Sequence, residues 1–186
     1  MSEDNKQIKK AKGRRAYLQE FTLDENGEYV FTGDTYFYDD SEISWSDITK
    51  KAKACFMFLL VAEIIVGFLP TPGMIKASYV ILPYGIFIIV LALAAYRFVQ
   101  IMKSQGSLRD YIYKKSAETF PGSVLLMIIL IACCLVGEII YVFFGKPETN
   151  LIFTAIAVLL HAFALFMGIG LLKTMQAMEW KIGQNK

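Results

Sequence analysis

Long apolar runs separated by short polar connections fill most of this chain. The four runs cover residues 54–69, 77–99, 122–144 and 151–172. An α-helix rises about 1.5 Å per residue, so about 20 residues are needed to cross the hydrocarbon core of a bilayer. The last three runs exceed that length, and the first can span if Lys51 and Lys53 extend their amines toward the lipid headgroups. The pattern predicts an all-α integral membrane protein with a bundle of four transmembrane helices.

Composition and charge add an orientation to this picture. Hydrophobic residues make up 55% of the chain, the mean hydropathy is +0.45, and a net charge of +2 indicates no nucleic-acid partner. Nine Lys and Arg residues precede the first run and five lie in 97–121, whereas the connections 69–76 and 144–150 hold one each. The positive-inside rule therefore predicts cytoplasmic N- and C-termini. We expect the protein to lie in the cell (plasma) membrane. We expect the first run to act as its own insertion signal, because the first 50 residues are polar and charged.

Two parts of the sequence are repeated. The hexapeptide LVAEII at 60–65 returns as LVGEII at 135–140, an offset of 75 residues. A second pair, RFVQIM at 97–102 and KTMQAM at 173–178, has an offset of 76. These matches predict two tandem helical hairpins with the same orientation, related by a pseudo-two-fold axis along the membrane normal. Chance similarity between apolar helices is the alternative.

Each copy of the hexapeptide places a glutamate, Glu63 or Glu138, inside an apolar run. Both lie seven residues before a helix-breaking residue, Pro70 or Gly145, and therefore at a similar depth of about 10 Å from the outer helix ends. Pro83, in the second run, falls at a similar level. We expect a polar layer in the outer half of the bundle. Its other candidate members are His161, Tyr79, Tyr84 and Tyr141.

The glutamates lack an obvious cation, because no Lys or Arg lies in the middle of any apolar run. Neutral acids can join helices through hydrogen bonds, which would be a structural role. They can instead share a proton or bind a cation from a water-filled cavity. Alternatively, a partner subunit supplies the positive charge. No metal ion or other cofactor is expected, because the chain has one histidine and no metal-ligand spacing.

The residues before the first run divide into two parts. The predicted division of the whole chain is 1–15, a disordered basic tail; 16–50, a cytoplasmic β-hairpin and short-helix segment; and 51–186, the four-helix transmembrane domain. The sequence DENG at 24–27 is typical of a hairpin turn. The sequence DDSEISWSDITKKAK predicts a short helix that leads into the membrane, with Ser41 or Ser46 as its N-cap.

A hairpin of this size is marginal in water unless its aromatic side chains are covered. They can pack on the connection 103–121 and on helix ends of the same chain, dock on another subunit, or lie at the level of the lipid headgroups. The candidate docking residues are Tyr17, Phe21, Tyr29, Phe31, Tyr36 and Trp45.

The sequence contains no motif that carries catalysis. It has no glycine-rich phosphate loop and no nucleophile with a base at a useful spacing, which argues against an enzyme. We therefore expect a non-catalytic accessory or assembly subunit of a larger membrane complex, with the lipid bilayer and either a protein partner subunit or further copies of the chain as partners. The alternative is a small transporter or channel that uses Glu63 and Glu138 to couple to protons or cations.

Overall fold

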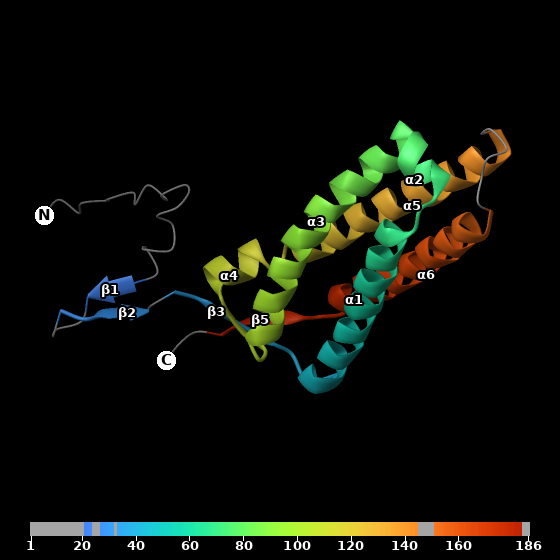
Figure 1. Ribbon diagram of the computed structural model, residues 1–186. Coiled ribbons are helices and arrows are strands. Elements are labelled where there is room, and N and C mark those ends of the chain that lie inside the picture. The colour runs from blue at the N-terminus through green and yellow to red at the C-terminus, as the bar shows by residue number, and fades with distance from the viewer. Residues whose placement is uncertain (1–20, 24–26, 32, 145–150, 184–186) are drawn as a thin grey trace, which may run out of the picture.

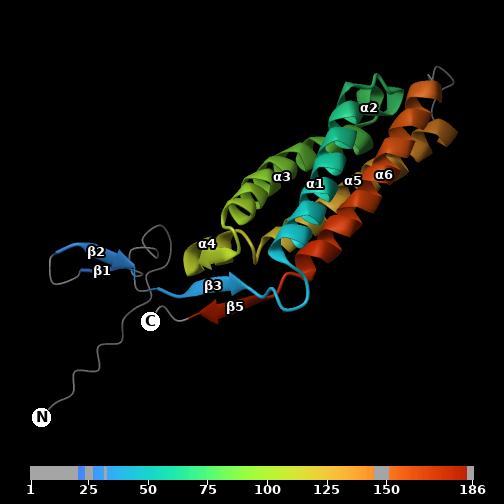
Figure 2. The same cartoon turned by 90° about the horizontal axis from the view of Figure 1, so that it is seen from below.

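The computed structural model describes residues 21–23, 27–31, 33–144 and 151–183, so the predicted disordered tail lies outside the described residues. The elements in chain order are β1 (Phe21–Leu23), β2 (Tyr29–Phe31), β3 (Thr35–Tyr38), α1 (Trp45–Phe68), α2 (Pro72–Lys76), α3 (Ser78–Lys103), β4 (Ser107–Arg109), α4 (Asp110–Lys115), α5 (Phe120–Phe144), α6 (Leu151–Gln176) and β5 (Trp180–Gly183). The long helices form a bundle with a small sheet at one end, called here the sheet end, and α2 at the other, the α2 end (Figures 1 and 2).

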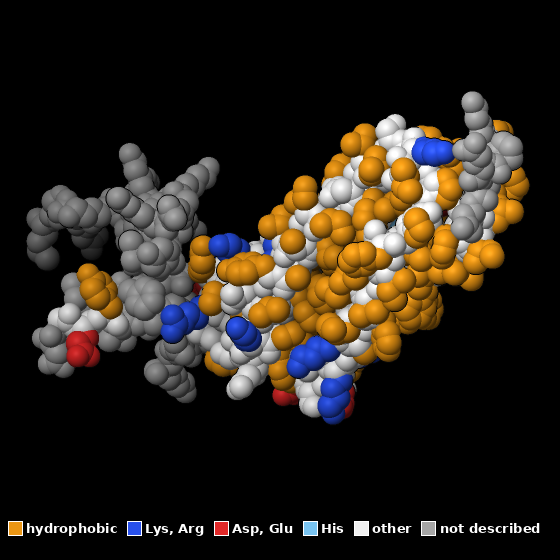
Figure 3. Space-filling model, viewed as in Figure 1, with side chains coloured by type: hydrophobic (Ala, Val, Ile, Leu, Met, Phe, Trp, Pro, Cys, Tyr) orange, Lys and Arg blue, Asp and Glu red, His pale blue; other side chains and the backbone are white. Residues whose placement is uncertain are grey.

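Three of the described helices are long and apolar enough to cross a membrane by length and composition. They are α3, α6 and the segment Asp110–Phe144 that contains α5. Helix α1 has 24 residues, a length sufficient to span, but its last 18 residues include Lys51, Lys53 and Glu63. Hydrophobic side chains cover the visible face of the bundle, and most of the visible Lys and Arg side chains lie near the sheet end (Figure 3).

The four long helices pack in a defined order. Helix α1 packs on α6, α6 on α5, and α5 on α3. Helices α1 and α3 approach each other mainly through long side chains, such as Phe56 and Phe98, whose stacked rings have centroids 4.5 Å apart. Gly168 brings α6 close to its neighbours, since a Cβ there would lie 3.0 Å from Ile128 and 3.4 Å from Leu59. This small residue therefore serves packing within the chain.

The buried faces of the helices repeat along the chain. Every buried position of α1 except Val66 has a buried counterpart 75 residues later in α5, which agrees with the offset of the two hexapeptides. The six buried positions of α3 all have buried counterparts 77 residues later, in and just after α6. The buried faces of α3 and α6 thus align at an offset of 77 residues, whereas the second pair of matching sequences has an offset of 76. This difference of one residue is significant, because successive residues of an α-helix point in directions about 100° apart.

Three distant segments form the small sheet. Strand β3 is central and pairs antiparallel with β4 on one side and with β5 on the other. Tyr36 stacks on Tyr113, with ring centroids 3.8 Å apart. Trp180 meets Trp45 and Tyr113 edge-on, with centroids 5.8 Å and 5.9 Å away. Tyr36, Tyr38 and Trp45 are therefore partly covered by the same chain, including a C-terminal strand that sequence reasoning did not predict, whereas Phe37 is 43% exposed.

The hairpin forms where the sequence predicts it. Strands β1 and β2 pair antiparallel, with Phe21 opposite Phe31, and Gly27 in the connecting turn has a positive φ of 80° that suits glycine. The predicted short helix is not a separate element but the first turns of α1. Its N-cap is Ser44 instead of Ser41 or Ser46, and the Ser44 side chain accepts a hydrogen bond from the Asp47 amide at 3.2 Å.

The pairing of β5 with the rest of the sheet is expected to weaken in acid. The side chain of Lys181 donates a hydrogen bond to Asp39, and this contact, with the Ser41 amide, lowers the pKa of Asp39 below its usual 3.8. A lowered carboxyl pKa stabilises the fold above pH 3.8, and this contribution is lost as the pH falls through the folded-state pKa. The protection factors of the β5 amides, which compare the observed exchange rate with the intrinsic rate at the same pH, should therefore fall in acid. Asp39→Asn should already have lower protection factors than the wild type at neutral pH, and these should change little further in acid.

Candidate functional site

Glu63 and His161 form a buried pair between α1 and α6. His161 Nδ1 lies 3.1 Å from Glu63 Oε1, and both side chains are completely buried. The two residues are 98 positions apart in the sequence, and the direct packing of α1 on α6 brings them together. The pair is net neutral whether the shared proton lies on the carboxyl or on the imidazole, which explains how an acid can be buried here.

A third helix reaches the same place. The Tyr84 hydroxyl of α3 donates a hydrogen bond to the backbone carbonyl of Glu63 at 2.7 Å. Gly67 makes room for it, because a Cβ at that position would lie 2.4 Å from the tyrosine oxygen. Tyr84 therefore ties α3 to α1 next to the buried pair. Its hydroxyl binds the backbone and not the carboxyl group.

Glu138 has a different setting at the α2 end. Its Oε1 accepts a hydrogen bond from the Thr71 hydroxyl at 2.7 Å, and both side chains are buried. Thr71 is also the N-cap of α2, where its oxygen accepts a hydrogen bond from the Met74 amide at 3.3 Å. Sequence reasoning missed Thr71, although the Thr71-Pro72 pair is a typical helix start with proline in the first position.

The remaining predicted members of the polar layer lie elsewhere. Within the described residues, Tyr79 and Tyr141 donate no hydrogen bond to either glutamate, and both are at least partly exposed. Tyr79 lines an apolar groove of about 610 Å³ on the outer face of α3 and α5. The structure thus brings together Glu63, His161 and Tyr84, and it holds Glu138 with Thr71 in a second cluster.

Both clusters keep unpaired polar atoms. Glu63 Oε2, His161 Nε2 and Glu138 Oε2 are buried and have no hydrogen-bond partner among the described residues. Leaving a buried polar group unpaired costs about 1–3 kcal/mol, so such atoms are uncommon. In the described part of the chain, no group of three or more potential ligands could hold a metal ion. The free positions can instead accept or donate a proton or a hydrogen bond.

The candidate docking residues also differ in their settings. Tyr17 lies outside the described residues, and Phe21 and Phe31 belong to the β1–β2 hairpin. Tyr29 of the same hairpin is 74% exposed. Tyr36 and Trp45 are only partly exposed and pack against other aromatic rings of the chain.

Searches of known protein-family models, of curated proteins and of solved structures find no match for this chain. The fold and the buried site therefore define its class by themselves. In the residues that the structure describes, the chain is mostly helical, with three helices long and apolar enough to span a membrane, a small three-stranded sheet, and buried acidic side chains.

Gly73→Ala is expected to destabilise the α2 end by about 1–3 kcal/mol. A Cβ at Gly73 would lie 2.4 Å from Glu138 Oε2, so the carboxyl group must move and its hydrogen bond with Thr71 is strained. Thermal unfolding in detergent measures the change. The matched control is Gly85→Ala in α3, where a new Cβ meets nothing within 4 Å and should stabilise the helix slightly. Equal stability of the two variants would contradict the packing of Glu138 on α2.

Proposed function

We propose that this chain is an integral membrane protein whose four long helices all cross the bilayer, with both termini in the cytoplasm. The composition of α1 is the only objection to a fourth span, and the burial of Glu63 against His161 removes its charge from contact with lipid. Lys51 and Lys53 lie toward the start of α1, near the sheet end, where their amines can reach headgroups. The sheet end is then the cytoplasmic end.

The topology can be tested by labelling single cysteines in intact cells. After replacement of the native cysteines with serine, Ile75→Cys introduces a thiol at the α2 end and Ile182→Cys one in the sheet, both at exposed positions. A membrane-impermeant maleimide should label Ile75→Cys without lysis and Ile182→Cys only after lysis. Labelling of both in intact cells would contradict the proposed topology.

Within the membrane, we propose that the protein is a non-catalytic accessory or assembly subunit of a larger complex. The observation that carries this is the β1–β2 hairpin, which stands away from the bundle with Tyr29 exposed, whereas Tyr36, Tyr38 and Trp180 of the sheet pack against other rings of the chain (Figures 1 and 2). An isolated two-stranded hairpin is at best marginally stable in water. A surface on a second protein would supply the missing cover.

The hairpin can be tested directly by site-specific crosslinking in membranes. A photoreactive residue in place of Tyr29 should give a discrete adduct with one other protein, and the same residue in place of Lys50, which is exposed at the start of α1, should not. Absence of an adduct at Tyr29, together with a fully stable monomer in mild detergent, would overturn the subunit proposal.

A second candidate function is proton-coupled transport, and the unpaired Glu63 Oε2 and His161 Nε2 favour it. A carboxyl group and an imidazole that share one proton can release it when a conformational change separates the two side chains. In liposomes, a proton gradient should then drive substrate or cation flux in the wild type but not in Glu63→Gln. Unchanged flux in both Glu63→Gln and Glu138→Gln would exclude this coupling.

A further inference from the structure

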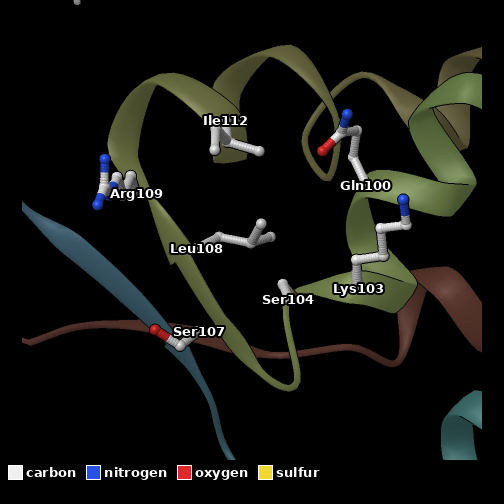
Figure 4. A pocket seen from close by; sticks show the side chains of 7 residues that line it. All are labelled: Gln100, Lys103, Ser104, Ser107, Leu108, Arg109 and Ile112. Atoms are coloured by element: carbon white, nitrogen blue, oxygen red, sulfur yellow. The ribbon is translucent and has the colours of Figure 1, made fainter.

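A hollow of about 270 Å³ lies at the sheet end, between the last turn of α3 and the β4–α4 segment. It is lined by Gln100, Lys103, Ser104, Ser107, Leu108, Arg109 and Ile112. Gln100 and Lys103 lie on one side, Arg109 on the opposite side, and the side chains of Leu108 and Ile112 between them (Figure 4). The hollow thus combines two cations and three uncharged polar side chains with an apolar floor.

The charges around this hollow favour an anion. Lys103 is exposed and makes no hydrogen bond or ion pair within the described part of the chain. The nearest acidic side chain in sequence, Asp110, is bound at 2.7 Å by Lys114, which compensates its charge. The last carbonyl groups of α3 carry partial negative charge, which repels an anion, and the positive charge of Lys103 in the last turn offsets this repulsion. Lys103 therefore leaves positive charge on one side of the rim, and the Arg109 side chain lies on the other.

The local fold fixes the two sides of the hollow. Helix α3 ends at Lys103, and the chain reverses through Gln105 and Gly106, which have positive φ values of 52° and 86°. Strand β4 then pairs with β3, with Arg109 opposite Thr35 and Leu108 only 2% exposed. The cations are thus presented by a helix end and a paired strand, which hold them on opposite sides before any ligand binds.

We propose that this hollow binds the phosphate group of an anionic phospholipid headgroup. Charged nitrogen donors bind phosphate oxygens through short, charge-assisted hydrogen bonds, and the Ser104, Ser107 and Gln100 side chains add uncharged donors. Basic hollows beside transmembrane helices at the cytoplasmic surface suit such headgroups. The apolar floor of Leu108 and Ile112 suits the glycerol and first acyl carbons, which free phosphate lacks. The site rests on the cytoplasmic placement of the sheet end proposed above.

The test is native mass spectrometry of the full chain, released from nanodiscs that contain phosphatidylglycerol or only phosphatidylcholine. Wild-type protein should retain one phosphatidylglycerol molecule, and Lys103→Gln should bind it about tenfold more weakly, as expected for one lost charge-assisted contact. Lys103→Arg should retain binding. The matched control is Lys50→Gln, which removes an exposed cation from α1 at the same end of the bundle.

Two further arms separate the alternatives. Inorganic phosphate alone, added to the lipid-free protein, should not raise its unfolding temperature. If phosphate raises the unfolding temperature of the wild type but not of Lys103→Gln, the hollow binds phosphate from a soluble ligand and not from a lipid headgroup. Equal weakening by Lys103→Gln and Lys50→Gln would show diffuse attraction to the positive end of the bundle and overturn the site. The outcome is separate from the topology, because maleimide labelling reports the orientation whether or not the site binds a headgroup.

Discussion

His161→Leu is expected to destabilise the protein by about 3–5 kcal/mol, the largest effect of any single substitution considered for this chain. Leucine fills much of the space of the imidazole but leaves the Glu63 carboxyl completely buried without its side-chain partner. The loss is therefore due to a stranded acid and not to a cavity. Unfolding in detergent, followed by tryptophan fluorescence against denaturant concentration, measures it.

A double substitution separates the pair from its parts. Glu63→Leu/His161→Leu should recover most of the stability lost in His161→Leu, because replacing both members of a buried polar pair by apolar residues is often neutral or stabilising. Thr71→Val, which removes the partner of Glu138 in the other cluster, should add to His161→Leu without coupling. If Glu63→Leu/His161→Leu is less stable than both Glu63→Leu and His161→Leu, then Glu63 and His161 do not act as a pair.

Trp180→Ala is expected to open the sheet at a cost of about 3 kcal/mol, with little effect on the bundle. Trp180 meets the rings of Tyr38, Trp45 and Tyr113, so its loss removes the aromatic contacts between the C-terminal strand and the other segments. Amide hydrogen exchange should accelerate in β3 and β5 and remain slow in α5 and α6.

The control for this prediction lies on the same strand. Ile182 lies opposite Tyr36 in the strand pairing but is 58% exposed, so Ile182→Ala should leave exchange in β3 almost unchanged. If both variants open the sheet equally, strand pairing and not the aromatic cluster holds it together. If Trp180→Ala unfolds α5 and α6 as well, the sheet is part of the cooperative unit of the bundle.

The sequence predicted the helices well because apolar periodicity and length are local properties. The four apolar runs all became helices, although each helix begins or ends a few residues beyond its run. The clearest extension is α1, which starts at Trp45 while its apolar run starts at residue 54. Polar residues such as Asp47 and Lys50 continue a helix in water as readily as apolar ones do in lipid, so hydropathy alone cannot place that boundary.

The polar layer shows where local reasoning stops. The repeat correctly placed Glu63 and Glu138 at buried, corresponding positions of α1 and α5. The sequence left their partners open, and the structure gives Glu63 the partner His161 and Glu138 the partner Thr71. Partners are set by which helices pack together, and α1 lies against α6 while α5 meets α2 near its end. No pattern within a single helix carries that information.

By itself, then, the sequence determined the mostly helical fold, the long helices, the hairpin turn and the two glutamates within the apolar runs. These follow from interactions within a few residues, such as helical periodicity and turn geometry. Only the tertiary structure decided that His161 is the partner of Glu63, that Thr71 binds Glu138, and that β5 completes a sheet with β3 and β4. Each of these contacts joins residues more than 60 positions apart in the chain, where the packing of whole helices, and not local preference, selects the neighbours.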